Sequence, residues 1–436
     1  MSIAVNSLRT YIFRIFTGLS GIIIGILIAR LLGPQGKGYY SGVFIFYNIF
    51  IQVGGTLGAA IVYQIARQKQ DPRVLLMTAS LFNLGLGLLT ILGFKLFTIL
   101  VPQFHPGPIW LVVALIPWAL ILSNITGVFQ GLNRIITLNW ISIIQGLIQI
   151  SLLLFGFFLP KFNVDDAIVF WLVSHVLAAI ITLWISREFW LPPVKNWFSW
   201  PLLGAMLRFS AQISLNNGIG ILNAQIDSLL VLFLLHTKNY GLYSVAVNGA
   251  SVLWYTTGAI TIAITAHVGK ADREAAGRLT ARAVRHTLLI NIPLALIMWG
   301  AAWLIPLVYG QRFSASMAPF RIMLPGILAY SIAAIFNTYF TNQLGKPRIP
   351  LLISFISMMI DLVGSLLLIP RFGMLGGAAA NSASYLISIS ILTGIFCRTA
   401  GFSLKDIFAI TKDDVADYKL LWDNLMRFLN RKLKRE

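Results

Sequence analysis

The chain has 436 residues, of which 58% are hydrophobic and only 11% are charged, and its formal net charge is +19 at pH 7. Soluble domains carry roughly 25% charged residues, so this composition excludes a water-soluble globule with a polar surface. The apolar runs are continuous rather than alternating, which excludes a membrane β-barrel and indicates an all-α polytopic membrane protein.

In chain order, the sequence predicts twelve apolar spans of about 20 residues, separated by short polar loops. They lie near residues 10–31, 39–65, 75–100, 109–131, 139–159, 166–186, 209–235, 241–267, 285–308, 317–342, 349–369 and 375–397. Arg9 and Arg14 stand at the first span as in a secretory signal peptide, but no small-residue cleavage site follows. We therefore expect this span to be retained.

The basic residues are unevenly distributed over the predicted loops. If both termini lie on one side, 25 of the 33 Lys and Arg residues fall on that side and only six on the other, among them Lys37. This asymmetry predicts cytoplasmic N- and C-termini and explains the positive charge without nucleic-acid binding. The single Cys397 and five scattered histidines show no ligand spacing, so we expect no metal and no cofactor.

Three short patterns recur on corresponding spans about half a chain apart: GYYS (38–41) and GLYS (241–244), Pro117 and Pro325, LPKF (159–162) and IPRF (369–372). They predict two homologous six-helix halves, residues 1–186 and 209–397, joined by an interfacial linker at 187–208. Because six is even, both halves face the same way, and their pseudo-two-fold axis runs along the membrane normal. This architecture is typical of transporters that place a site between the halves.

Three longer stretches, ARLLGPQGKGYYSGVF (29–44), QIDSLLVLFLLHTKNYGLYSVA (225–246) and LGKPR…LIPRFGMLGGAAANSASY (344–385), resemble Wzx-type polysaccharide flippases. These belong to the multidrug/oligosaccharidyl-lipid/polysaccharide export (MOP) superfamily. The resemblance implies a multi-pass protein of the bacterial plasma membrane. Its expected activity is to move a polyprenyl-diphosphate-linked oligosaccharide from the inner to the outer leaflet.

Ionisable side chains inside membrane spans are costly, so each is a candidate for function. Asp227 and Asp361 are candidates for partners of a cavity cation or for a coupling-ion site, taking a proton or sodium; the alternative is a buried interhelical hydrogen bond. Arg14 is a candidate diphosphate contact, or else a snorkelling anchor. Arg321 lies near the outer end of its span, where snorkelling is the simpler interpretation.

Uncharged polar residues gather on the helices expected to face the other half. Asn48, Gln52 and Asn223 are candidate substrate contacts, because amides donate to and accept from sugar hydroxyls. Amides also join membrane helices to one another, and that interpretation stays open for each of them.

The last segment, 398–436, predicts a basic amphipathic helix after the capping pattern formed by Thr411 and Asp414. Its expected partner is the anionic inner leaflet or, alternatively, another polysaccharide assembly protein. We expect a tail deletion from about residue 404 to spare translocation but to weaken membrane association or stability.

Two rival functions remain. A multidrug or cation antiporter of the same superfamily would favour an acidic cavity. A membrane-embedded glycan polymerase or transferase needs acid–base or metal-binding groups at the membrane face, and the only adjacent carboxylate pair, Asp165 and Asp166, lies in a short outer loop. The sequence therefore favours a transporter rather than an enzyme, with the sign of the cavity charge as the discriminating observation.

Overall fold

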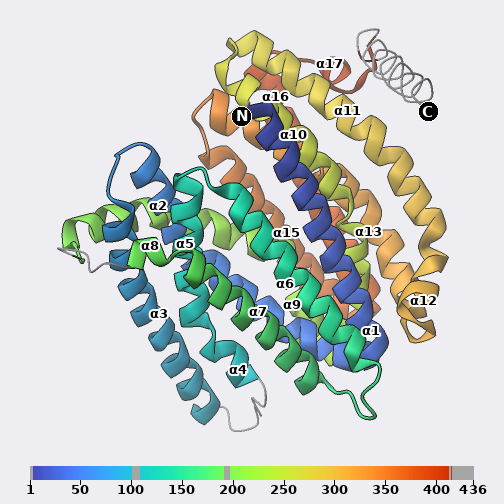
Figure 1. The fold of residues 1–436 in the computed structure, drawn as a ribbon. Coiled ribbons are helices and arrows are strands. Elements are labelled where there is room, and N and C mark those ends of the chain that lie inside the picture. Colours follow the sequence, from blue (N-terminus) through green and yellow to red (C-terminus); the bar gives the residue numbers. More distant parts are fainter. Residues whose placement is uncertain (1–2, 101–108, 191–196, 412–413, 415–436) are drawn as a thin grey trace, which may run out of the picture.

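The computed structural model describes residues 3–100, 109–190, 197–411 and 414, and within them the regular elements are all helices (Figure 1). Ten helical segments of this described part are long and apolar enough to cross a membrane. The all-α polytopic prediction is therefore confirmed.

The helices before the linker are α1 (Ile3–Gly54), α2 (Leu57–Ala66), α3 (Pro72–Leu100), α4 (Ile109–Ala114), α5 (Ile116–Gly131), α6 (Ile135–Gly156) and α7 (Val164–Ile185). Those that follow are α8 (Arg187–Trp190), α9 (Trp200–Ala250), α10 (Leu253–Lys270), α11 (Arg273–Gly300), α12 (Leu304–Tyr309), α13 (Met317–Tyr330), α14 (Ala333–Thr338), α15 (Arg348–Phe372), α16 (Met374–Ala400) and α17 (Leu404–Phe408). A π-helical turn, Tyr339–Gln343, follows α14.

Two of the ten segments each contain two of the predicted spans, because α1 and α9 reverse direction at a kink. Gly33 has φ 66° and ψ −176°, and His236 has φ 64° and ψ 176°, so the same backbone conformation recurs 203 positions apart. The positive φ breaks the helix without a loop. Ten segments therefore accommodate all twelve spans that the sequence predicts.

The two kinks meet in a reciprocal backbone contact. A Cβ added to Gly38 would lie 1.7 Å from the carbonyl oxygen of Thr237, and one added to Gly241 would lie 1.9 Å from that of Pro34. Pro34 and Thr237, like Gly38 and Gly241, are 203 positions apart, so the contact obeys the sequence repeat. Glycine is required at both places because only its backbone can approach so closely. We call this contact the glycine seal, and the end of the bundle that holds it the kinked end.

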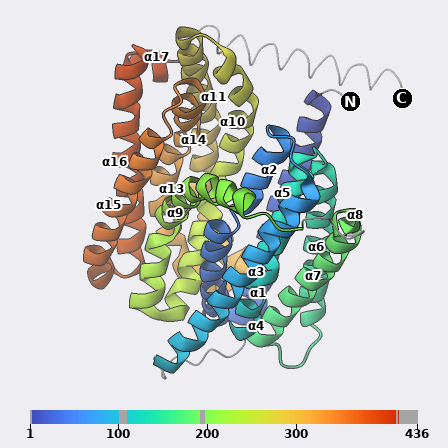
Figure 2. The same cartoon turned by 90° about the vertical axis from the view of Figure 1, so that its left-hand side faces the viewer.

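The opposite end, the terminal end, holds the first turns of α1 together with α17 (Figure 1). Figure 2 shows α6 and α7 to one side of α1 and α9, and α15 and α16 to the other. The contacts between α1 and α9 are the most extensive of any helix pair in the described chain. These two kinked helices therefore form the junction between the halves.

Corresponding asparagines tie the helices together within each half. Asn83 on α3 donates to the Leu120 carbonyl and to Asn124, and Asn291 on α11 donates to the Leu253 carbonyl and to the hydroxyls of Thr257 and Ser331. Both side chains are fully buried, and they lie 208 positions apart. The repeat thus extends to polar contacts that fix the helix packing.

The LPKF (159–162) and IPRF (369–372) segments end their helices differently, although both predicted spans stop just before the proline. Pro370 lies inside α15, which continues to Phe372 and ends where Gly373 adopts φ 58°. In the first half α6 already ends at Gly156, and its Cβ position faces the Phe162 ring. The glycine conformation rather than the proline therefore ends α15.

Gly376 on α16 provides a test of helix packing. A Cβ at this position would lie 2.3 Å from the Leu368 carbonyl oxygen of α15, so Gly376→Ala is expected to lower stability by about 1–3 kcal/mol. Gly394→Ala on the same helix has open space and should be neutral or slightly stabilising. The measurement is the thermal unfolding of both variants in detergent. Equal midpoints for the two would contradict tight α15–α16 packing.

A buried ion pair joins α11 to the segment that follows α17. The Arg285 side chain, 9% exposed, donates from Nε to Asp414 Oδ2 at 2.6 Å and from Nη2 to Oδ1 at 3.3 Å. Its Nη1 donates to the Asp406 carbonyl at 2.5 Å. Thr411 and Asp414 form the expected capping contacts, whereas the predicted helix from residue 415 onward lies outside the described residues.

Candidate functional site

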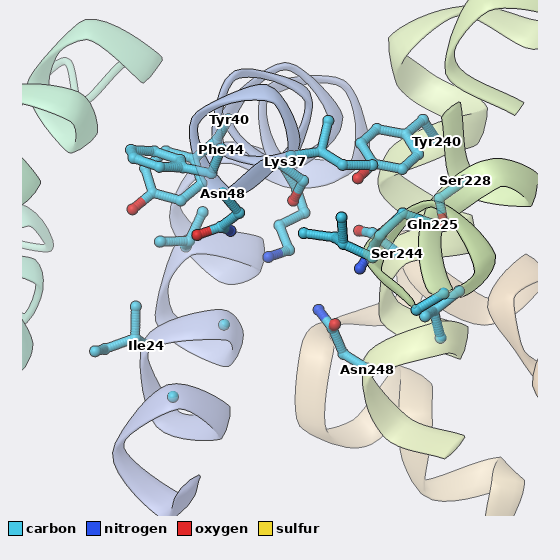
Figure 3. A pocket seen from close by; sticks show the side chains of 18 of the residues that line it. Ile24, Lys37, Tyr40, Phe44, Asn48, Gln225, Ser228, Tyr240, Ser244 and Asn248 are labelled. Carbon is cyan, nitrogen blue, oxygen red and sulfur yellow. The ribbon is translucent and has the colours of Figure 1, made fainter. Parts of the chain in front are cut away.

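A cavity of about 450 Å³ lies between α1 and α9, at the junction of the halves (Figure 3). Its walls come from both arms of each kinked helix: Gly21, Ile24, Gly25, Ile28, Lys37, Tyr40, Ser41, Phe44, Ile45, Asn48 and Gln52 from α1, and Gly220, Ile221, Ala224, Gln225, Ser228, Tyr240, Ser244, Val247 and Asn248 from α9.

The cavity follows the sequence repeat. Ser41 and Ser244 both line it and are 203 positions apart, and the same spacing relates Lys37 to Tyr240. The pseudo-two-fold relation therefore passes through this space, as expected for a transporter site built between repeats. The chemistry is not symmetric, because Lys37 on α1 corresponds to a phenol on α9.

Among the described residues, the lining combines amides, hydroxyls and aromatic rings without a carboxylate. Lys37 is the one charged residue that the described chain places on this lining. Its side chain extends into the space between the two helices, toward the amides of Asn48 and Gln225 (Figure 3). A cavity of this polarity suits a hydroxylated ligand with negative charge and disfavours a cationic one.

Lys37 is a cavity residue that the sequence interpretation did not single out. Counting apolar runs placed it in a loop, but it lies within α1, one turn past the Gly33 kink, and is 5% exposed. Within the described chain it has neither an ion pair nor a hydrogen bond. The available signal was its position next to GYYS, since the matching GLYS marks the same kink in the second half.

Two of the predicted contact residues, Asn48 and Gln52, line the cavity. The third, Asn223, lies elsewhere: it is 2% exposed and donates from Nδ2 to the Tyr330 hydroxyl at 3.1 Å. That contact joins α9 to α13. Its Oδ1 is buried without a hydrogen-bond partner.

The two predicted carboxylates lie inside the second half, behind the cavity wall. Asp227 is 1% exposed and accepts from the Tyr243 hydroxyl at 2.6 Å and from the Ser228 amide at 2.7 Å. Ser228, the next residue along α9, lines the cavity, whereas Asp227 does not.

Asp361 on α15 is fully buried and accepts from Ser365 at 3.0 Å and from Asn381 of α16 at 3.4 Å. Asp227 and Asp361 are near enough to interact electrostatically. No group of three or more His, Cys, Asp or Glu side chains in the described residues gathers as a metal cluster. Each of the two acids is therefore surrounded by hydroxyl and amide donors rather than by a metal cluster.

The predicted arginines do not line the cavity among the described side chains. Arg321 donates to the Trp299 carbonyl at 3.2 Å, and its guanidinium lies 5.1 Å from the centre of the Trp299 ring. These contacts fit an anchor on α13. Arg14 lies in the first part of α1, but its side chain is outside the described part of the structure.

The fold resembles those of solved membrane transporters of the MOP superfamily. The inward-facing conformation of a multidrug resistance MATE family transporter gives a TM-score of 0.73 at 13% identity, covering 88% of this chain and 94% of that one. The outward-facing conformation of such a transporter gives 0.63 at 14% identity, covering 91% and 94%. The lipid II flippase MurJ, in an inward closed conformation, gives 0.72 at 14% identity, covering 96% and 92%.

Residues 27–318 match the model of a family described as polysaccharide biosynthesis protein. The chain belongs to this family. No curated protein sequence matches it significantly. Family and fold together confirm the resemblance to Wzx-type flippases of the MOP superfamily and define a multi-pass membrane protein.

Proposed function

We propose that this protein moves a polyprenyl-diphosphate-linked oligosaccharide from the inner to the outer leaflet by alternating access. The observation that carries the proposal is the cavity between the halves, whose described lining consists of amides, hydroxyls, rings, small and aliphatic residues and one lysine, without a carboxylate. Sugar hydroxyls and a diphosphate cannot cross hydrocarbon unsolvated, and a polar cavity replaces their water.

The same lining argues against the two rivals. A cation antiporter needs negative charge at its substrate, and the carboxylates Asp227 and Asp361 lie behind the wall rather than on it. The glycan polymerase or transferase depended on Asp165 and Asp166. Asp166 instead accepts the Asn163 amide in a capping box at the start of α7, so its position has a structural explanation.

In the proposed cycle the kinked end is the outer face and is closed here, while the terminal end is the inner face. The higher TM-score with an inward-facing than with an outward-facing transporter supports this assignment. Arg14 lies 19 residues, or roughly 28 Å of helix, from the Gly33 kink. We place it near the inner mouth, as a contact for the diphosphate.

Asp227 and Asp361 are proposed to bind the coupling ion, a proton or sodium. Each carboxylate is buried with neutral donors and without a basic partner among its hydrogen bonds. A buried carboxylate in such surroundings is stabilised either by protonation or by a bound cation. Through Ser228 and Tyr243, occupancy of this pair would change the wall of the cavity.

The topology has a direct test. Reporter fusions at Ser403 and at Lys238 are expected to report opposite sides of the membrane, because Ser403 begins α17 at the terminal end and Lys238 follows the His236 kink. Activity of a cytoplasmic reporter at Ser403 and of a periplasmic one at Lys238 is the expected result. Both reporters on one side would refute the proposed arrangement.

The function itself is tested in cells that lack this protein. We expect lipid-linked oligosaccharide to accumulate on the inner leaflet and to be cleared when the wild-type chain is restored. A chain that restores no clearance, but lowers the accumulation of cationic dyes, would overturn the flippase proposal in favour of the antiporter.

A further inference from the structure

Lys37 has an unusual position even for a cavity residue. It follows the Gly33–Pro34 kink by one turn and precedes Gly38 of the glycine seal, so it marks the closed end of the cavity. Its side chain is directed into the cavity (Figure 3), with 5% exposure and without an ionic or hydrogen-bonding partner in the described structure. A buried ammonium without a partner is costly, and an anionic ligand would remove that cost.

The depth of Lys37 indicates which part of a substrate it meets. Fifteen residues of α1 separate Lys37 from Gln52, so the lining extends along about 22 Å of helix. A substrate that enters from the terminal end keeps its prenyl chain in the membrane. The diphosphate, which adjoins that chain, then remains near the mouth, and the far sugars reach the closed end.

The neighbours of Lys37 fit a sugar ring. Gln225, Ser244 and Asn248 of α9 lie on the opposite wall, and they offer neutral donors and acceptors for hydroxyls. Tyr40 and Tyr240 add flat apolar surfaces at the same level. One cation among neutral hydrogen-bonding groups and rings is complementary to a sugar that carries a single negative charge.

We propose that the closed end of the cavity is a subsite for an acidic sugar, and that Lys37 binds its carboxylate. The substrate class is thus a lipid-linked oligosaccharide with an acidic residue distant from the lipid. This inference rests on the proposed flippase function and adds a specificity to it. The diphosphate of the same substrate is the rival ligand for Lys37, because it also presents anionic oxygen atoms.

The test uses purified full-length protein in liposomes and two polyprenyl-diphosphate tetrasaccharides that differ only in the terminal sugar, glucuronic acid or glucose. Flipping is measured by the protection of the glycan from an external label. We expect Lys37→Gln to slow the flipping of the glucuronic acid substrate about tenfold or more and to change the flipping rate of the glucose substrate by no more than about twofold. Lys37→Arg should retain most of the acidic flux.

Lys161→Gln is the matched control, because it removes an exposed cation from the α6–α7 connection outside the cavity. Lys37→Met replaces Lys37→Gln if the latter folds poorly, as judged by thermal unfolding. An equal loss of flux for both substrates would assign Lys37 to the diphosphate and overturn the subsite. Unchanged flux for both substrates would also overturn the subsite. If the wild-type protein moves neither substrate, the flippase proposal fails as well. This outcome distinguishes failure of the flippase function from failure of the subsite alone.

Discussion

Replacing Asp227 with asparagine is expected to lower flipping at least tenfold while leaving the folded protein in the membrane nearly unchanged. The substitution preserves size and an oxygen that accepts from the Ser228 amide, and the Tyr243 hydroxyl can turn to accept from the new amide group. Only the negative charge is lost. If that charge binds the coupling ion, the variant loses the ion-dependent change that drives the transport cycle.

The measurement is lipid-linked oligosaccharide flux in liposomes with imposed sodium or proton gradients. Asp361→Asn should produce the same defect, because both carboxylates are proposed to bind the coupling ion. Asp165→Asn is the control, since this acid lies in the exposed first turn of α7. Wild-type flux in Asp227→Asn under both gradients would show that the carboxylate is a structural hydrogen-bond acceptor.

The second large effect concerns stability. Arg285→Met is expected to lower the free energy of unfolding by about 3–5 kcal/mol, because it leaves the buried Asp414 carboxylate without its cation. The double variant Arg285→Met, Asp414→Leu should recover much of that loss, since neither charge is then buried alone. Arg278→Met on the same helix removes only an exposed pair with Glu274 and should cost about 0.5 kcal/mol or less.

Thermal or denaturant unfolding in detergent measures these differences. An Arg285→Met effect no larger than that of Arg278→Met would contradict a stabilising role for the buried pair. The tail is relevant to the same point: a deletion from residue 404 removes Asp414 and should destabilise the protein, whereas one from residue 415 spares the pair. The two deletions therefore separate loss of the ion pair from loss of membrane association.

The pair also has a defined pH dependence. Burial alone would raise the pKa of Asp414, but hydrogen bonds from Arg285 and Thr411 outweigh it and lower the pKa to about 2. The unfolded value is about 3.9. A lowered pKa means that the stabilisation is complete above about pH 4 and is lost as the pH falls toward 2. Near neutral pH the contribution of this group should not vary.

The sequence predicted the number and location of the spans because each depends only on local hydropathy. It also predicted the repeat, since GYYS and GLYS mark the arms of the two kinks. It did not predict that α1 and α9 continue through those kinks. The polar segments at the kinks, GPQGKG (33–38) and HTKNYG (236–241), look like loops in the sequence, although each reversal needs only one residue of positive φ.

The site was harder to predict, because which face of an apolar helix meets the other half depends on packing. Lys37 was assigned to a loop because it lies in the polar break between two apolar runs, yet it enters the cavity. Asn48 and Asn223 looked equivalent as amides on facing helices. Only the three-dimensional arrangement separates a cavity residue from one that bonds to Tyr330.

The glycine seal has a consequence for leakage. At Gly38 and Gly241 the two halves meet backbone to backbone, so at this point there is no side chain whose rotation could admit water. A chain of hydrogen-bonded water that could conduct protons requires space that such a contact does not offer. In the proposed cycle, this contact would let the cavity be hydrated from one face while the membrane keeps the ion gradient that drives the next turn.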